Sequence, residues 1–153
     1  MHFPGHSQED EERRDLLLYL LSGVPSVSPA PKIQAIMNLL NRDFDISDKY
    51  RFRRQFLART DTELESDILK LDLQKFVGYE PAGKDAGGRM MKITPSGIRY
   101  LDFFGTGKTL GKRLGAKLDE IEDMFFVYNS MDFGELLVLQ NSPEAPINRG
   151  KAY

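Results

Sequence analysis

The sequence predicts a mainly helical α+β protein with one small β-hairpin, and three observations support this fold class. Apolar residues recur every three or four positions in several segments, as they do on the buried face of a helix. Two short strand-like runs, 76–79 and 89–93, flank the turn-forming sequence EPAGKDAGG. The second run leads into ITPSG, where Thr94 can cap a helix and Pro95 can take its first position.

The N-terminal part is expected to form two helices. The first opens at a capping box made by Ser7 and Asp10, carries the run LLLYLL and ends near Gly23. After the joint SGVPSVSPAP, which is rich in Ser and Pro, the second helix begins at Pro31, a residue suited to a first helical turn. Its apolar stripe, the clearest among the short helices, consists of Ile33, Ile36, Met37 and Leu40.

Residues 41–59 fit neither the helical nor the strand pattern well, and aromatic and basic side chains are interleaved in their second half. We expect a helix in this segment. Thr60 and Glu63 then form a capping box, and the helix that they open extends to about Lys75, directly before the predicted hairpin. Its apolar residues at helical spacing are Leu64, Ile68 and Leu71.

The C-terminal part is expected to be helical as well. The helix that starts at Pro95 should bury its apolar residues, Ile98, Leu101 and Phe104. The sequence GTGKT, which begins at Gly105 and ends at Thr109, is interpreted as a flexible linker to one long helix. A last helix covers residues 132–141. We therefore expect a domain of residues 1–104 with a loose start at 1–7, a helical extension at 105–141 and a flexible tail at 142–153.

The order of these elements is that of a winged helix: helices, a helix directly before a Gly-rich hairpin, a return strand and a further helix. The predicted architecture is therefore a winged helix-turn-helix core with a C-terminal helical extension. Where this fold reads DNA, the second helix of the helix-turn-helix pair enters the major groove. Residues 60–75 take that position here.

The composition limits the class of protein. With 153 residues, of which 41% are hydrophobic and 29% charged, the chain fits one globular domain. It has no apolar stretch of the roughly 18 to 20 residues that a membrane span needs, no cysteine and no secretory signal pattern, so we expect a cytoplasmic protein with no membrane partner. The formal net charge of −2 provides no overall attraction for a polyanion, and any nucleic-acid site must be a local patch.

Motifs for catalysis and cofactor binding are incomplete. GTGKT resembles the end of a phosphate-binding loop, but that pattern requires glycine where Asp102 stands, so no nucleotide is expected there. The only histidines, His2 and His6, are separated by Pro4 and Gly5 and have no evident third metal ligand. We therefore assign no catalytic residue, no metal site and no cofactor, and we expect a protein that is not an enzyme.

Two oppositely charged segments are candidates for binding. Residues 49–59 contain five basic residues, no acid and several aromatic rings, a composition that can contact phosphates. A solvated helix with its aromatic rings in the core has equal weight. The hairpin adds three basic residues, as a DNA-contacting wing often does. The candidate nucleic-acid-binding residues are Lys49, Arg51, Arg53, Arg54, Arg59, Lys84, Arg89 and Lys92.

The helix at 60–75 argues against groove binding, since it has five acidic residues and only two basic ones, Lys70 and Lys75. Carboxylates crowd the end that would meet the bases, where the DNA phosphates would repel them. We interpret this helix as a surface for a protein partner instead. Its candidate contact residues are Asp61, Glu63, Glu65 and Asp67.

The long helix expected after GTGKT suggests a homodimer. Its basic residues (Lys108, Lys112, Arg113, Lys117) precede its acidic ones (Asp119, Glu120, Glu122, Asp123), the reverse of what the helix dipole favours. Two copies packed antiparallel would set basic halves against acidic halves. The alternative, with equal weight, is that the seam packs on its own domain. The candidate seam residues are Leu114, Leu118, Ile121, Phe125 and Tyr128.

Four stretches carry a resemblance to known proteins: KIQAIMNLL, FRRQFLARTDTELESDILKL, KITPSGIRYL and VYNSMDFGELLVLQNSPE. The order of the elements over roughly residues 31–144 resembles that of the YwgA-like and Panacea-type winged-helix families. The resemblance implies a small cytoplasmic protein associated with regulation or antitoxin activity. Our leading hypothesis is therefore a non-catalytic regulatory module, antitoxin-like or adaptor, that binds another protein. The alternative is a DNA-binding transcriptional regulator that uses residues 49–59 and the wing.

Overall fold

The computed structural model describes residues 8–28, 31–46, 53–55, 58–81 and 89–141. Within these ranges the protein is mostly helical with two small antiparallel hairpins, which confirms the predicted α+β class. The helices are α1 (Gln8–Leu21), α2 (Pro31–Phe44), α3 (Thr62–Leu73), α4 (Pro95–Phe103), α5 (Thr106–Leu114), α6 (Ala116–Asn129) and α7 (Phe133–Gln140). The strands are β1 (Arg53–Gln55), β2 (Ala58–Thr60), β3 (Val77–Pro81) and β4 (Arg89–Ile93).

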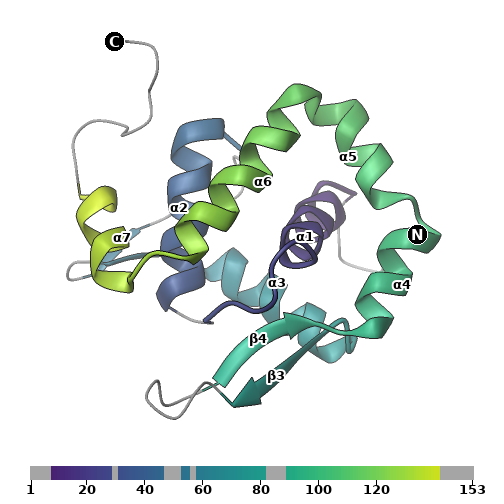
Figure 1. The fold of residues 1–153 in the computed structure, drawn as a ribbon, viewed down its shortest axis with the longest axis horizontal. Coiled ribbons are helices and arrows are strands. Elements are labelled where there is room, and N and C mark those ends of the chain that lie inside the picture. Colours follow the sequence, from purple (N-terminus) through teal and green to yellow (C-terminus); the bar gives the residue numbers. More distant parts are fainter. Residues whose placement is uncertain (1–7, 29–30, 47–52, 56–57, 82–88, 142–153) are drawn as a thin grey trace.

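Helix α1 lies at the centre of the molecule. Figure 1 views it almost end-on, with the other helices and the β3–β4 hairpin arranged around it. It contacts α3, α4, α5 and β4. In its second half only Asp15 and Tyr19 are partly exposed, whereas five leucines are buried, as expected of a helix largely enclosed by a core. These residues are Leu16, Leu17, Leu18, Leu20 and Leu21.

Helices α4, α5 and α6 form an arc around α1 (Figure 1), and a glycine stands at each corner. Gly105 precedes α5 with φ 56° and Gly115 precedes α6 with φ 60°, a region that glycine enters without the steric penalty of a Cβ atom. Two predictions were therefore wrong. GTGKT is not a flexible linker, because α5 begins at Thr106, and the expected long helix is two helices.

The break at Gly115 also reduces the charge conflict predicted for the long helix. Lys112 and Arg113 lie in the last turn of α5, and Asp119 lies in the first turn of α6. Cations at a helix C-terminus and anions at an N-terminus are what the helix dipole favours. Lys108 in the first turn of α5 and Lys117 in the first turn of α6 still oppose the dipole, so the break relieves only part of the conflict.

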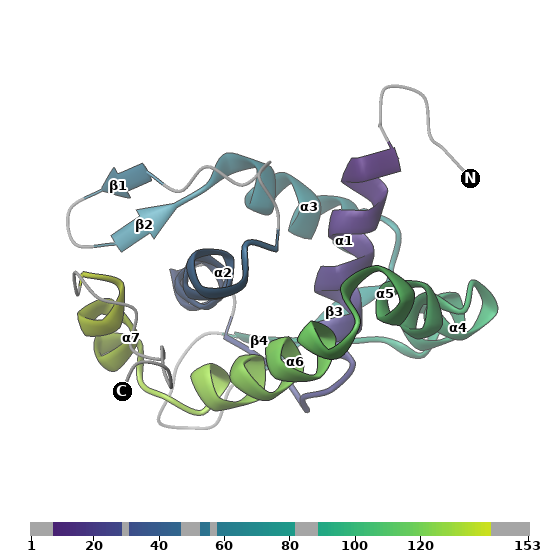
Figure 2. The same ribbon diagram turned by 90° about the horizontal axis from the view of Figure 1, so that it is seen from above.

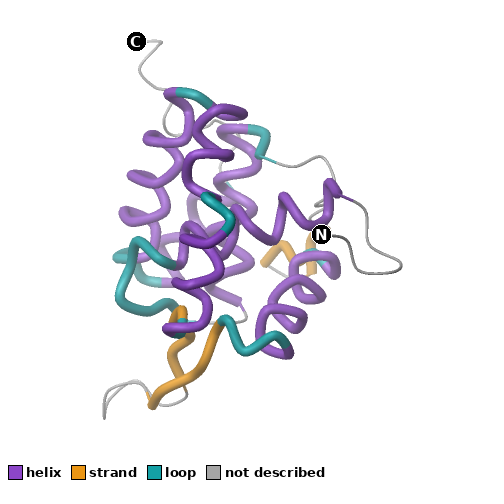
Figure 3. Tube along the Cα trace, turned by 90° about the vertical axis from the view of Figure 1, so that its right-hand side faces the viewer, coloured by secondary structure: helices purple, strands orange, loops and turns teal. Residues whose placement is uncertain are grey.

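The predicted hairpin between residues 76 and 93 is confirmed as β3 paired with β4, in a register that places Val77 opposite Ile93. Val27, in the connection between α1 and α2, forms a β-bridge with Met91 of this hairpin. The backbone N–H of Val27 donates to the Met91 carbonyl at 2.8 Å, and the N–H of Met91 donates to the Val27 carbonyl at 2.7 Å. Figure 3 shows this hairpin at one end of the helical body. Its tip, residues 82–88, lies outside the described residues.

The helix expected at 41–59 was wrong for the residues that the structure describes after the end of α2 at Phe44. Arg53–Gln55 and Ala58–Thr60 pair as strands, with Arg54 opposite Arg59. Phe52 and Phe56 are the only aromatic pair at helical spacing among residues 49–59, so a helix would have only a short apolar face to bury against its neighbours. Strand β2 instead lies beside α2 (Figure 2).

The start of α3 is held by Asp61, and not by the expected box of Thr60 and Glu63. An Asp61 carboxylate oxygen accepts from the backbone N–H of Leu64 at 2.8 Å. The side-chain amide of Gln34, on α2, both accepts from the Asp61 N–H at 2.8 Å and donates to the Asp61 carbonyl at 3.0 Å. A buried glutamine therefore clamps the first turn of α3 onto α2.

The start of α4 is as predicted, with Thr94 as the cap and Pro95 in the first position. The Thr94 hydroxyl accepts from the Gly97 N–H at 3.1 Å. Gly97 allows α4 to approach β3 and β4, since a Cβ atom there would lie 2.4 Å from the Phe76 carbonyl oxygen. Of the apolar residues expected to be buried by α4, only Leu101 is; Ile98 and Phe104 are exposed.

A second group of elements surrounds α2, which lies between α6, α7 and β2 (Figure 2). Helix α7 begins and ends within one residue of its predicted bounds. It is tied to α2 by Asn38, which donates to Gln140 at 2.8 Å, and by Arg42, which donates to the Leu139 carbonyl at 3.0 Å. One hydrophobic core extends from Leu16 to Leu136, and it crosses the expected boundary between residues 104 and 105.

Candidate functional site

The predicted nucleic-acid-binding residues do not gather into one described patch. Arg53 and Arg54 lie on β1 and Arg59 lies on β2, whereas Arg89 and Lys92 lie on β4. The Arg89 guanidinium stands over the Tyr79 ring at 4.9 Å, and the Lys92 ammonium is 3.5 Å from Glu80. Both cations are exposed, and both already have contacts within their own hairpin. The remaining candidates, Lys49, Arg51 and Lys84, lie outside the described residues.

Two of the four predicted protein-contact residues on the acidic segment are buried, which corrects that assignment. Asp67 is 0% exposed, and its carboxylate receives two hydrogen bonds from the Arg13 guanidinium, at 2.6 and 2.8 Å. Asp61 is 4% exposed and serves as the cap of α3. Both side chains hold α3 in place, so neither is available to a partner. Glu63 and Glu65 remain on the surface.

The exposed face of α3 is apolar toward its end, a feature that the charge pattern concealed. Leu69 is 56% exposed and Leu73 is 71% exposed, and with Glu65 they repeat every four residues along one face of the helix. We call these three residues the α3 face. Single exposed leucines are ordinary, but two adjacent ones on a single helical face form an apolar surface without cover from the described residues.

The predicted dimer seam is part of the protein's own core. Leu118, Ile121, Phe125 and Tyr128 are buried, and Leu114 packs partly buried against them. The Tyr128 hydroxyl donates to Asp43 on α2 at 3.0 Å, which ties this face of α6 inward. The seam assignment was therefore wrong, and its alternative, packing within the domain, is what the structure has. A homodimer stays a prediction without an assigned surface.

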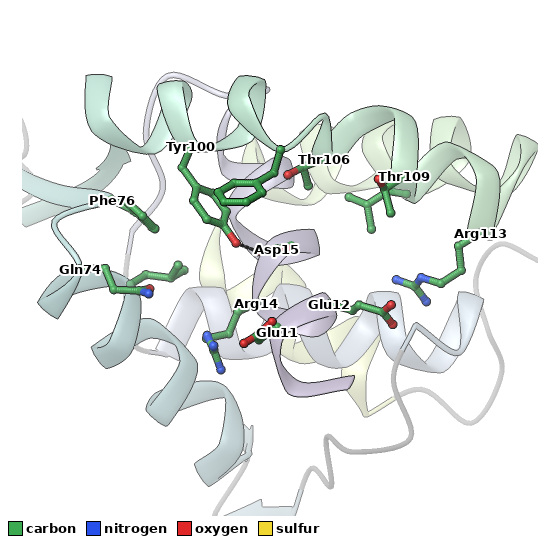
Figure 4. Close-up of a pocket in the computed structure, with 13 residues that line it drawn as sticks. Glu11, Glu12, Arg14, Asp15, Gln74, Phe76, Tyr100, Thr106, Thr109 and Arg113 are labelled. Atoms are coloured by element: carbon green, nitrogen blue, oxygen red, sulfur yellow. Dashed lines mark hydrogen bonds between the residues drawn. The ribbon is translucent and has the colours of Figure 1, made fainter. Parts of the chain in front are cut away.

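A pocket of about 340 Å³ lies between α1, the end of α3 and the α4–α5 corner (Figure 4). None of its residues was predicted as a site. One wall is aromatic: the Phe76 and Tyr100 rings are 4.7 Å apart between centroids, and the Tyr100 and Phe104 rings are 4.9 Å apart. The remaining apolar lining residues are Leu71 and Leu110.

The turn after α3 places part of this wall. Lys75 adopts a left-handed conformation with φ 68°, so the chain reverses there. The N–H of Phe76 then donates to the Leu71 carbonyl at 3.0 Å and that of Lys75 to the Asp72 carbonyl at 3.0 Å, a Schellman motif. The motif sets Phe76 beside Leu71, and both line the pocket.

Helix α1 supplies the charged side of the pocket. The Tyr100 hydroxyl donates to Asp15 at 2.8 Å (Figure 4). Burial raises the pKa of the Asp15 carboxyl above its ordinary value; the hydrogen bond from Tyr100 and the charge of Arg14 act in the opposite direction, and Glu11 and Glu12 raise it further. Burial also raises the pKa of Tyr100, followed by its hydrogen bond to Asp15.

Arg14 is the most unusual lining residue. It is only 4% exposed, and its Nη1 atom has no hydrogen-bond partner among the described residues. A buried guanidinium normally satisfies its donors, since an unsatisfied one costs about 1 to 3 kcal/mol or more. The Arg14 Nη1 group is therefore a hydrogen-bond donor in the wall of the pocket that no described residue uses.

Helix α5 supplies the opposite side. Thr106, Thr109 and Arg113 lie on one helical face, at spacings of three and four residues, and all line the pocket. Figure 4 shows the Glu12 and Arg113 side chains pointing toward one another from α1 and α5. Neither forms a hydrogen bond or an ion pair with any residue that the structure describes. The helical spacing of TGKTLGKR could have revealed this face, had GTGKT not been interpreted as a linker.

Other kinds of site have less support in the described part of the chain. No group of three potential metal-ligating side chains occurs there, and His2 and His6 lie outside it. No described helix is long and apolar enough to cross a membrane.

Comparison with known protein families, with curated proteins and with solved structures found no match to this chain. The resemblance to the YwgA-like and Panacea-type families therefore stays a prediction.

Proposed function

We propose that this protein is a non-catalytic regulatory module of the winged-helix type, antitoxin-like or adaptor, which binds a protein partner through the α3 face. The observation that carries the proposal is the pair of exposed leucines, Leu69 and Leu73, on the helix that precedes the hairpin. Apolar side chains flanked by carboxylates suit a protein surface better than the phosphates of a nucleic acid.

The order of elements supports the winged-helix part of the proposal. Helix α1 is followed by the Val27 segment, α2, α3 and the β3–β4 hairpin, and the Val27 segment pairs with β4. A β-bridge from the connection between the first two helices to the hairpin is compatible with this architecture. The additional β1–β2 hairpin between α2 and α3 lengthens their connection.

The test compares capture of partners by the intact protein and by a variant in which Leu69 and Leu73 are both replaced by Asp. Val138, on α7, is 69% exposed and provides the matched control, Val138→Asp. A partner that binds the intact protein and the control but not the α3 variant supports the proposal. Equal capture by all three proteins contradicts it, provided that circular dichroism gives all three the same melting temperature.

A DNA-binding regulator remains the second candidate, and one observation favours it. Two of the acids on the α3 segment, Asp61 and Asp67, are buried, so the exposed charge on this helix is less negative than the sequence indicated. Binding to duplex DNA should then weaken steeply as salt rises, and Arg53→Glu with Arg54→Glu should abolish it. DNA binding at low salt that is no stronger than that of an inert acidic protein would exclude this candidate.

A further inference from the structure

We propose that the pocket between α1, α4 and α5 binds a small zwitterion with an aromatic body, of the chemical class of the free aromatic α-amino acids. This goes beyond the proposed function, since the α3 face is a separate surface. The inference starts from the shape of the pocket. A volume of about 340 Å³ is at the small end of the range for ligand sites, and it suits a metabolite better than a polymer.

The aromatic wall selects the body of the ligand. Phe76, Tyr100 and Phe104 form a chain of ring contacts along one side of the pocket. Phe104 is half exposed although it packs against Tyr100, so the wall has uncovered ring surface. A flat apolar group that stacks on this wall would remove that surface from water.

The charges select the head group. The lining residues include three carboxylates, from Glu11, Glu12 and Asp15, and two guanidiniums, from Arg14 and Arg113. A simple anion would meet the carboxylates, and a simple cation would meet the guanidiniums. A ligand with both an ammonium and a carboxylate group can satisfy both sides at once.

The placement of the charges supports a ligand that bridges the two sides. Glu12 on α1 and Arg113 on α5 point toward one another without an ion pair (Figure 4). The ligand ammonium would bind Glu12, and the ligand carboxylate would bind Arg113, with the Thr109 hydroxyl beside it. The unpartnered Nη1 of Arg14, in the same lining, offers a further donor.

Isothermal titration of the full chain tests the ligand class. The probes are L-phenylalanine, L-tyrosine and L-tryptophan, together with 3-phenylpropionate, which lacks the ammonium group, and 2-phenylethylamine, which lacks the carboxylate. At least one of the amino acids should show saturable binding. The affinity of each analogue should be lower than that of L-phenylalanine by a factor of about ten or more. The absence of binding by all three amino acids, or equal binding of the analogues, overturns the proposal.

Two variants assign the head groups. Arg113→Gln should lower the affinity for the bound amino acid about tenfold and leave the affinity for 2-phenylethylamine unchanged. Glu12→Gln should lower the affinity for the amino acid by the same factor and leave the affinity for 3-phenylpropionate unchanged. Lys112→Gln, an exposed neighbour that does not line the pocket, is the control. If the control loses as much affinity as the two variants, or the variants lose none, the site is misassigned. The Leu69→Asp, Leu73→Asp protein should bind the amino acid normally, which separates this proposal from the proposed function.

Discussion

Buried charge at single positions holds the central helix in place. Arg13 on α1 and Asp67 on α3 are both buried, and two hydrogen bonds join them across 54 residues of sequence. Glu63 also approaches the Arg13 guanidinium, at 3.6 Å, with a side chain that is largely exposed. Hydropathy could not distinguish Asp67 from the surface acids beside it, because the distinction depends on a partner that is distant in sequence.

Replacement of Asp67 by Ala should lower the free energy of unfolding by about 3 to 5 kcal/mol, since it leaves the Arg13 guanidinium buried without its carboxylate. The double variant Arg13→Met, Asp67→Leu should recover much of this loss, because apolar groups of similar volume need no partner. Urea unfolding measures both. Glu63→Gln is the control and should cost less than about 1 kcal/mol. A double variant no more stable than Asp67→Ala would contradict the role assigned to the pair.

The Asp15 carboxyl should make stability depend on pH. Its pKa is raised in the folded state, with Glu11, Glu12, Arg14 and Tyr100 as its charged and titratable neighbours. The folded protein therefore binds the proton more tightly than the unfolded chain does. The stability from this group is fully present below its unfolded pKa and is lost as pH rises through the raised value.

The variant Asp15→Asn should retain the hydrogen bond from Tyr100 without the burial cost of a charge. Its stability relative to the intact protein should therefore increase as pH rises from about 4 to neutrality. Melting temperatures of both proteins across this range measure the difference. Asp102→Asn, at an exposed position on α4, provides the control. A difference between Asp15→Asn and the intact protein that does not change with pH would contradict the expected linkage.

At the scale of elements, the sequence predicted most helices and the main hairpin, because their signals are local. Thr94 and Pro95 predict the start of α4 correctly from neighbouring residues alone. The helix break at Gly115 was missed, since apolar spacing continues through it from Leu114 to Leu118. A glycine within a periodic pattern is ambiguous until the neighbouring helices show that the chain must turn there.

Glycine substitutions on the arc should have opposite effects according to their surroundings. Gly97→Ala should destabilise the protein by about 1 to 3 kcal/mol, because the new methyl group would clash with the Phe76 carbonyl and the Ile93 side chain. Gly111→Ala, within α5 and with nothing near its Cβ position, should stabilise it by about 0.5 to 1 kcal/mol. Thermal unfolding checks both. The same sign for the two variants would contradict the close approach of α4 to the hairpin.

At the scale of the whole molecule, the candidate sites depend on contacts that the sequence does not show. The pocket combines residues from α1, α3, α4 and α5, so no local motif contains it. The predicted seam and acidic surface had correct apolar and charge patterns, but these patterns do not reveal which face is covered. Which face of a helix is buried depends on the elements that pack against it in the folded chain.

The C-terminal helices should unfold together with the rest of the protein, because one core includes them. Leu136→Ala, at a fully buried position on α7, should lower the free energy of unfolding by about 2 to 5 kcal/mol. Val138→Ala, at an exposed position on the same helix, should change it by no more than about 0.5 kcal/mol. Denaturant unfolding followed by circular dichroism tests this. A separate early transition in the Leu136→Ala protein would show that α7 is an independent unit.

The central position of α1 has a consequence for the order of events during synthesis. The residues that enclose this helix leave the ribosome long after it does: Tyr100 bonds to Asp15 across 85 residues, and Glu122 bonds to Tyr19 across 103. Until then its leucine-rich half has few partners, and exposed apolar segments of a nascent chain are targets for chaperones and for aggregation. A helix that is sequestered in the finished protein is therefore among the most vulnerable parts of the growing one.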